Sequence, residues 1–162
     1  MDRTTPCWRY AIAIGSNRRG RHGAPRAEVR AAIGALGGTV AVSPIIETAP
    51  IGPSIRRFAN ACVVVDSAEP PDALLARLKR IERAFGRRRG RRWGERVIDL
   101  DIVLWSGGAR SSPTLTIPHR LFRDRDFVLR PLATIAPAWR DPVTGRTICQ
   151  LAHMVDPRRR SP

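Results

Sequence analysis

Four short apolar segments alternate with two amphipathic segments along the chain, and their order limits the fold more than any other feature. The apolar segments are typical of strands and span residues 10–14, 39–48, 58–66 and 97–105. Apolar residues recur at helical spacing over residues 25–36 and 71–85. Pro44 inside the second apolar segment indicates an edge strand or a bulge. The order β-α-β-β-α-β predicts an α+β fold, a ferredoxin-like sandwich, with a less regular C-terminal extension and a helix around residues 127–135.

The length of 162 residues is typical of one domain, with a core expected over about residues 10–136 and a disordered tail at residues 156–162. Cys7, Cys62 and Cys149 are too widely spaced to predict a disulfide framework or a zinc site. No apolar run approaches the ~18 residues of a membrane span, and the first residues do not resemble a secretion signal. We therefore expect a cytoplasmic protein that does not bind membranes, and we expect it to be a monomer.

The net charge of +15 raises the hypothesis of a nucleic-acid partner. Lys79 is the only lysine, and the other basic residues, apart from histidine, are arginines spread along the chain, a skew that coding bias can also produce. The ferredoxin-like fold hosts RNA recognition, which stacks bases on aromatic side chains of the central strands. Only Tyr10 and Phe58 could serve in this way. We expect no specific binding of nucleic acid, and a basic nucleic-acid-binding domain is the alternative function.

Two aspartates follow an arginine-rich segment. Six arginines lie within residues 87–96, and Asp99 and Asp101 come soon after them in the fourth predicted strand. Side chains alternate along a strand, so both carboxylates share one face. The side chains that then point into the core are Ile98, Leu100 and Ile102. Carboxylates bind Mg²⁺ and arginines bind phosphate. The combination predicts an enzyme that acts on a nucleotide polyphosphate with Mg²⁺. The alternative is that the two aspartates are only solvated surface residues.

Several motifs accompany these residues. The most specific reads Arg-Trp-Gly-Glu-Arg-Val-Ile-Asp-Leu-Asp-Ile over residues 92–102. Shorter motifs are Ala-Ile-Gly-Ser-Asn at 13–17, Thr-Ala-Pro-Ile-Gly-Pro at 48–53, Phe-Ala-Asn at 58–60, Ile-Pro-His at 117–119 and Arg-Asp-Phe-Val-Leu at 125–129. In this order the chain resembles the 6-hydroxymethyl-7,8-dihydropterin pyrophosphokinase family of folate biosynthesis, over about residues 10–136. The resemblance implies transfer of pyrophosphate from ATP to the pterin hydroxymethyl group, with release of AMP.

The resemblance also implies roles for residues around a magnesium and ATP site. Asp99 and Asp101 would hold two Mg²⁺ ions, and Arg87 and Arg96 would take part in catalysis. The residues implied in ATP binding are Glu82, Arg87, Arg96, Ile98, Thr116, His119 and Arg125. Without the family context, Glu82 is typical of an exposed helix charge and His119 of a structural or solvated histidine. Since the chain has no Gly-x-x-x-x-Gly-Lys loop, phosphate binding would depend on arginines and metal.

A flat pterin ring needs aromatic faces for stacking and an amide to pair with its polar edge. The resemblance implies that Phe58 and Phe127 stack on the two faces of the ring and that Asn60 pairs with its edge. The other residues implied in pterin binding are Thr48, Ala49, Ile51 and Trp93. Core packing is the alternative role for either phenylalanine, and a relative that kept the fold but lost the activity is a further alternative for the whole chain.

Overall fold

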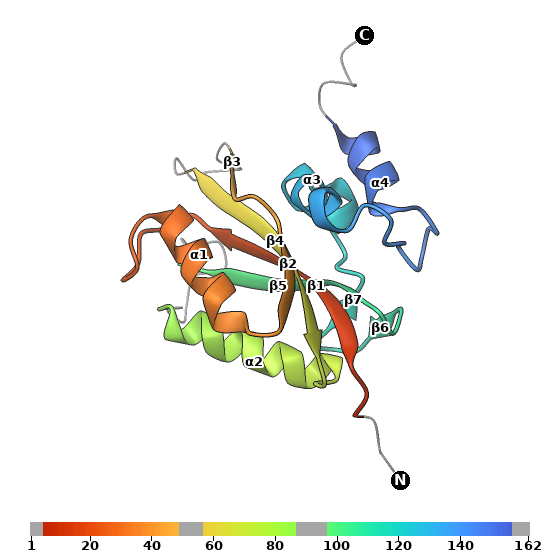
Figure 1. Ribbon diagram of the computed structural model, residues 1–162, viewed down its shortest axis with the longest axis horizontal. Helices are drawn as coiled ribbons and strands as arrows, with labels where there is room; N and C mark the ends of the chain where they lie inside the picture. Colours follow the sequence, from red (N-terminus) through yellow and green to blue (C-terminus); the bar gives the residue numbers. More distant parts are fainter. Residues whose placement is uncertain (1–4, 49–56, 87–96, 157–162) are drawn as a thin grey trace.

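The computed structural model describes residues 5–48, 57–86 and 97–156, and a five-stranded sheet lies at its centre (Figure 1). The strands of this sheet are β1 Trp8–Ser16, β2 Thr39–Val42, β3 Ile46–Thr48, β4 Phe58–Ser67 and β5 Asp99–Trp105. A small second sheet consists of β6 Arg110–Ser111 and β7 Thr116–Ile117. The helices are α1 Pro25–Leu36, α2 Pro71–Ala84, the short 3-10 helix η1 Phe122–Asp124, α3 Asp126–Ile135 and α4 Ile148–Val155. None of the helices in these ranges is both long and apolar enough to cross a membrane.

The central strands of the sheet are β1 and β4. β1 pairs antiparallel with both β4 and β5, and β4 pairs antiparallel with β2 and β3 as well. The resulting order is β2-β4-β1-β5, with β3 also on β4. The two βαβ halves thus interleave in one antiparallel sheet, which is the ferredoxin-like arrangement. The predicted fold class is confirmed.

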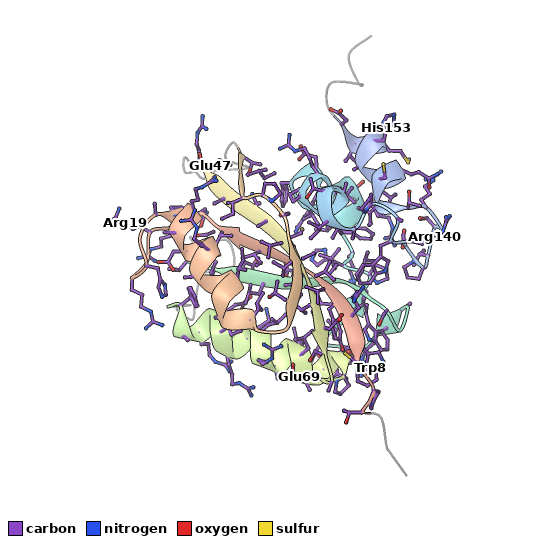
Figure 2. The ribbon with its side chains drawn as sticks, in the orientation of Figure 1. Trp8, Arg19, Glu47, Glu69, Arg140 and His153 are labelled. Carbon is purple, nitrogen blue, oxygen red and sulfur yellow. The ribbon has the colours of Figure 1, made fainter. Side chains whose placement is uncertain are left out.

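Helices cover both faces of the sheet (Figure 1), and side chains fill the space between the helices and the sheet (Figure 2). On one face, α1 and α2 pack through a core cluster to which they contribute Val29, Leu36, Leu74 and Leu78, each at most 2% exposed. On the other face, α3 and α4 pack around a second cluster that includes the fully buried Phe122. The predicted apolar stripe of α2 is therefore confirmed, because its leucines recur one turn apart on the buried side.

The single strand predicted over residues 39–48 is wrong, because the structure has two strands there. Pro44 lies in the break between β2 and β3 and has no N–H to donate to a sheet. Ser43 spans the break: its N–H donates to the Cys62 carbonyl at 2.9 Å, and its hydroxyl accepts the Cys62 N–H at 2.9 Å. Contact with β4 therefore continues across the interruption, and the irregularity expected at Pro44 is confirmed.

The C-terminal extension is more regular than expected, since it contains α4. Thr147 begins this helix with a capping box, in which its side chain accepts the Gln150 N–H and the Gln150 side chain accepts the Thr147 N–H. Ile148 and Leu151 then pack in the second cluster. The spacing Thr-x-x-Gln before an apolar residue is a helix start signal that the sequence analysis missed. At the other predicted strands, β1 is longer than residues 10–14, and β5 begins at residue 99 rather than 97.

Candidate functional site

Asp99 and Asp101 lie on the face of β5 opposite the α1–α2 layer. Leu100 and Ile102 alternate with them and are at most 3% exposed in the cluster beneath these helices. Both aspartates are half-buried instead, and Val103, the next residue on their face, packs in the cluster beneath α3. The predicted alternation is thus confirmed, with both carboxylates on the α3 side of the sheet.

Asn60 lies in the same cross-strand row as Asp99. Gly15 of β1 pairs with Asn60 on one side and with Asp99 on the other. Two strand spacings, or ~10 Å, therefore separate the two Cα atoms. A Cβ on Gly15 would meet Asn60 Oδ1 at 3.2 Å. The glycine of the Ala-Ile-Gly-Ser-Asn motif thus keeps the sheet surface open between the amide and the carboxylate.

Three of the residues predicted to bind the pterin, Thr48, Phe58 and Asn60, lie together on β3 and β4, and a fourth, Phe127, lies on the same side of the sheet. The Asn60 side chain is 6% exposed, and its Nδ2 donates to Thr48 Oγ1 at 3.1 Å. Thr48 pairs with Phe58, which lies two residues before Asn60 in β4 and therefore on the same face. Helix α3 contacts β3 and β4, and its Phe127 packs against the second cluster on this side of the sheet. The other predicted pterin residues, Ala49, Ile51 and Trp93, lie outside the described residues.

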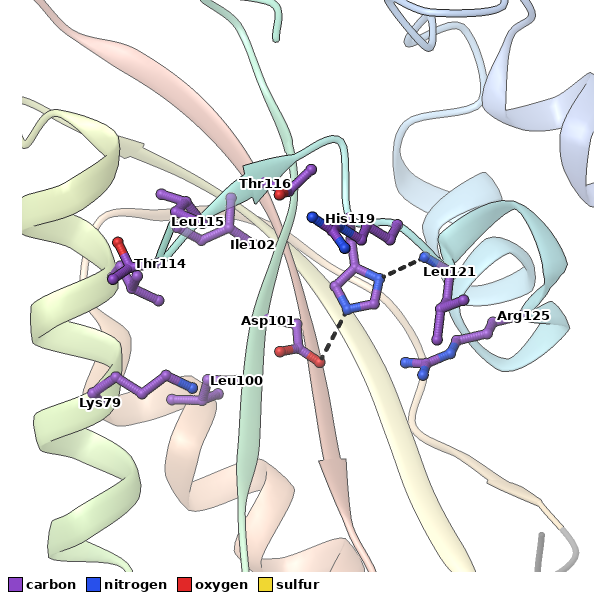
Figure 3. Close-up of a pocket in the computed structure, with 12 residues that line it drawn as sticks. Lys79, Leu100, Asp101, Ile102, Thr114, Leu115, Thr116, His119, Leu121 and Arg125 are labelled. Atoms are coloured by element: carbon purple, nitrogen blue, oxygen red, sulfur yellow. Dashed lines mark hydrogen bonds and ion pairs between the residues drawn. The ribbon is translucent and has the colours of Figure 1, made fainter. Parts of the chain in front are cut away.

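A cavity of about 460 Å³ opens beside β5 at the edge of the sheet (Figure 3). Leu75 and Lys79 of α2 form one wall, and residues 114–125 contribute the other. Its polar lining residues are Lys79, Asp101, Thr114, Thr116, His119, Arg120 and Arg125. Among these described residues, cationic side chains outnumber the single carboxylate, which suits a polyanionic ligand such as a polyphosphate.

Three of the residues predicted to bind ATP, namely Thr116, His119 and Arg125, line this cavity. Ile98 does not line it, since its side chain is 2% exposed in the core beneath α1 and α2. Ile102 reaches the cavity instead, so the geometry does not support a contact through the Ile98 side chain. Arg87 and Arg96 lie outside the described residues.

The sequence analysis predicted Glu82 of α2 as an ATP contact but not Leu75 or Lys79, the two residues of this helix that line the cavity. Leu75, Lys79 and Glu82 are spaced four and three residues apart, so they share one face of the helix. That spacing could have predicted a second face of α2, with both apolar and charged residues, directed at the edge strand β5. Thr114 and Arg120 also line the cavity, and no local pattern marks them.

Glu82 is buried and is not the exposed helix charge that its position alone suggests. It is 1% exposed, its Oε1 accepts the Leu100 N–H at 2.9 Å, and Lys79 Nζ lies 3.2 Å from both of its oxygens. The carboxylate therefore joins α2 to β5 beside the cavity. Its role in ATP binding stays a prediction.

Replacing Glu82 by alanine should lower the free energy of unfolding by about 1–3 kcal/mol, because the buried Leu100 N–H would lose its acceptor. Urea unfolding followed by circular dichroism measures this change. Glu82→Gln is the matched control, since its amide oxygen can still accept the Leu100 N–H, and it should lose less stability. Equal stability of the wild type and the alanine variant would show that the carboxylate does not hold α2 to β5.

His119 is fixed by its backbone and by one ring nitrogen. Its N–H donates to the Val103 carbonyl at 3.1 Å, and the Leu121 N–H donates to Nδ1 at 3.2 Å. Since Nδ1 accepts, the proton of the neutral ring is on Nε2. Nε2 lies 3.9 Å from Asp101 Oδ2 (Figure 3). The imidazole therefore presents an N–H donor beside the aspartate pair.

The environment of His119 favours the neutral ring. Burial lowers the pKa of the imidazole below its usual value of 6.5, the positive charge of Arg125 lowers it further, and Asp99 partly opposes both effects. At pH 7 the side chain of His119 is therefore uncharged in the ligand-free protein.

NMR titration of the ligand-free protein should give a midpoint for His119 below 6.5. The unfolded chain then takes up this proton at a higher pH than the folded chain. The associated stability is complete above ~6.5, falls as the pH drops from the unfolded pKa towards the folded one, and levels off below it. His119→Gln should remove this component from the pH dependence of the urea midpoint. A titration midpoint above 6.5 would contradict a buried, neutral ring.

The aromatic residues that RNA recognition would need on the central strands are not both available. Tyr10 is 0% exposed, and its hydroxyl donates to the Glu69 carbonyl at 2.6 Å, so its ring cannot stack on a base. Of the two, this leaves only Phe58, which is half-buried and lies two residues before Asn60, for stacking on a base. The described surface of β1 and β4 therefore gives no support to the alternative of a nucleic-acid-binding sheet.

Comparisons with known proteins identify the family of the chain. A family model described as 7,8-dihydro-6-hydroxymethylpterin-pyrophosphokinase matches residues 11–137. The chain is 39% identical over 149 residues to a 2-amino-4-hydroxy-6-hydroxymethyldihydropteridine pyrophosphokinase of Pseudomonas aeruginosa, covering 88% of this chain and 89% of the relative. It is 44% identical over 105 residues to a protein of the same name from Synechocystis sp., covering 65% of this chain and 54% of that one. The match therefore spans about half the length of the Synechocystis relative.

A solved structure supports the fold. The Plasmodium falciparum HPPK-DHPS triple mutant superposes with a TM-score of 0.73 at 16% sequence identity. The superposition covers 94% of this chain and 45% of the Plasmodium chain. At this identity the likeness concerns the fold alone, and it includes almost all of the chain.

Proposed function

Because the chain belongs to the 7,8-dihydro-6-hydroxymethylpterin-pyrophosphokinase family, we propose that it transfers a pyrophosphoryl group from ATP to 6-hydroxymethyl-7,8-dihydropterin. The products are the pterin diphosphate and AMP, in the synthesis of folate. The observation that carries the proposal is the arrangement of Asn60, Asp99 and Asp101 on one face of the sheet, with a cation-lined cavity beside it. The amide of Asn60, which suits the pterin ring, therefore lies on the same face as the carboxylates that would bind metal and beside the cations that would bind the phosphates of ATP.

The pterin would lie along the row that joins Asn60 to Asp99. Thr48 accepts from Asn60 Nδ2, which leaves Oδ1, above Gly15, to accept from the polar edge of the ring. Phe58 and Phe127 would stack on the two faces of the ring, and Ala49, Ile51 and Trp93 would complete its contacts. The ~10 Å between Asn60 and Asp99 leaves room for a bicyclic ring whose hydroxymethyl group points to the carboxylates.

ATP would occupy the cavity beside β5. Leu75 and Leu115 offer apolar walls for the base, while His119 and Arg125 lie on the side of Asp101 (Figure 3). The neutral His119 would donate its Nε2–H to a phosphate oxygen, and Arg125 would supply positive charge. Pyrophosphoryl transfer needs alignment and charge stabilisation more than covalent help. Thr116, Glu82, Arg87 and Arg96 remain predicted ATP contacts, with the two arginines at the reacting phosphates. Ile98 could contact ATP only through its backbone, because its side chain is buried in the core.

Asp99 and Asp101 would hold two Mg²⁺ ions. Their oxygens are the hard ligands that Mg²⁺ prefers, and both carboxylates share one half-buried strand face. No third His, Cys, Asp or Glu forms a cluster with them in the described part of the chain, so the other coordination positions would fall to water and phosphate oxygens, as is usual for this ion. When bound, the ions would offset phosphate charge and orient the acceptor hydroxyl.

We also propose that the enzyme is a single-domain monomer of the cytoplasm without a specific nucleic-acid partner. Size-exclusion chromatography with light scattering tests the monomer. The charge of +15 should give only weak binding to random RNA at physiological salt, with a steep dependence on salt concentration.

The decisive test of the activity is incubation with ATP, Mg²⁺ and 6-hydroxymethyl-7,8-dihydropterin, followed by mass spectrometry of the products. We expect AMP and the pterin diphosphate in equal amounts. A matched control replaces the hydroxymethyl group by methyl, which removes the acceptor oxygen and should give no AMP above background. Release of ADP instead of AMP, or no pterin diphosphate, would refute the proposed function.

A further inference from the structure

We propose that Asp141, acting through Arg123, is a positioning residue that holds His119 and Arg125 in place for ATP; this inference rests on the function proposed above. Asp141 lies beyond the residues 11–137 that the family model matches. The contact therefore links the C-terminal extension to the wall of the ATP cavity.

Asp141 is a fully buried carboxylate with several donors. Arg123 binds it through two parallel bonds, Nε to Oδ2 at 2.7 Å and Nη2 to Oδ1 at 2.8 Å. The Val143 N–H donates to Oδ1 at 3.0 Å, and the Thr144 hydroxyl donates to Oδ2 at 2.7 Å. Burial alone would raise its pKa, but the bonds from Arg123, Thr144 and Val143 outweigh it and bring the pKa to about 2. The carboxylate thus stays charged and fixed in orientation at neutral pH.

Arg123 belongs to η1, the short turn that connects His119 to Arg125. The Phe122 N–H donates to the His119 carbonyl at 3.3 Å, and the Arg125 N–H donates to the Phe122 carbonyl at 3.3 Å. The Leu121 N–H, at the start of the same turn, donates to His119 Nδ1. A rotation of η1 would therefore move both the imidazole and the guanidinium that line the cavity.

Apolar packing alone does not fix that rotation. Phe122 is 0% exposed and packs in the second cluster with Ile148 and Leu151 of α4. Such contacts are non-directional, whereas two parallel N–H···O bonds from an arginine to a carboxylate impose one orientation. A buried ion pair contributes little net stability compared with apolar residues of similar volume. The main effect of the Arg123–Asp141 pair is therefore to orient η1.

The test compares Asp141→Asn, Arg123→Gln, the double variant and Asp124→Asn. Asp124 is an exposed carboxylate on the same turn, so Asp124→Asn makes the same change of charge while keeping both hydrogen bonds of the Arg123–Asp141 pair. With each substrate varied in turn, kcat/KM for ATP should fall roughly 10- to 100-fold in Asp141→Asn, while KM for the pterin stays unchanged. The double variant should be no worse than the more severe single variant, because both single changes remove the same contact.

A second readout does not depend on activity. Amide hydrogen exchange of Leu121 and Arg125 should be faster in Asp141→Asn than in the wild type and unchanged in Asp124→Asn. If the wild type releases no AMP, the proposed function fails, and the exchange rates still decide whether Asp141 orients the turn. Unchanged exchange, or equal losses towards both substrates, would overturn the positioning role. If Asp141→Asn does not fold, Arg123→Lys answers the same question, since it keeps the charge but cannot form two parallel bonds.

Discussion

Turnover should fall by roughly three orders of magnitude when Asp101 is replaced by asparagine, and by a similar factor for Asp99→Asn. Charge stabilisation by a bound metal is worth several kcal/mol, and each ~1.4 kcal/mol changes the rate tenfold. Asparagine has nearly the size of aspartate, and both side chains are half-buried rather than in the core, so the variants should fold. The initial rate of AMP release from ATP in the presence of the pterin measures the effect.

Asp124→Asn is the control for these variants, because it removes an exposed carboxylate from the turn near the cavity and should keep the wild-type rate. Thermal unfolding of all three variants shows whether the fold is intact. A rate close to that of the wild type for either Asp99→Asn or Asp101→Asn, in folded protein, would remove the metal assignment.

Asn60→Ala and Phe127→Ala should weaken pterin binding by roughly 10- to 100-fold and leave ATP binding nearly unchanged. The Asn60 variant would leave the polar edge of the bound pterin without its hydrogen-bond partner, which costs about 1–3 kcal/mol. The Phe127 variant would lose the surface on which the pterin ring stacks. Neither side chain lines the ATP cavity. The nearest link is the Arg125 guanidinium, 5.6 Å from the centre of the Phe127 ring, and Arg125 keeps its charge in the Phe127 variant. Calorimetric titration with each ligand separately measures both affinities.

Phe127→Leu separates stacking from packing. Leucine keeps much of the apolar volume that packs against the second cluster but has no ring to stack on the pterin. It should therefore bind the pterin as weakly as Phe127→Ala while unfolding at a higher temperature. Equal loss of affinity for both ligands would indicate a general packing defect, and full pterin affinity in Phe127→Leu would rule out stacking by this residue.

Local patterns were sufficient for most of the fold. The stripe of Leu74 and Leu78 on α2 follows from the 3.6-residue period of a helix, and the alternation of Asp99, Leu100 and Asp101 follows from the two-residue period of a strand. Both periods are properties of the backbone, so they can be recognised without knowing what the element packs against. The antiparallel ferredoxin-like order followed from the succession of these elements.

Contacts between distant segments were not predictable in this way. From its position in α2 alone, Glu82 would be an exposed charge. In the structure it accepts a hydrogen bond from the Leu100 N–H of the edge strand β5. Pro44 indicated an irregularity, but Ser43 decided its form by bonding to Cys62. Each partner lies 18 or 19 residues away, and no local period connects the two ends of such a contact.

The sequence by itself determined the identity of the chemical groups and the faces on which they lie, because residue type and backbone period are local. It thereby determined the paired carboxylates, the amide of Asn60 and the motifs that place the chain in its family. Only the tertiary structure decided that Gly15 separates Asn60 from Asp99 and that the cavity lies at the edge of β5. These features depend on strand register and on helix docking, which are set by packing and hydrogen bonding between segments far apart in the chain.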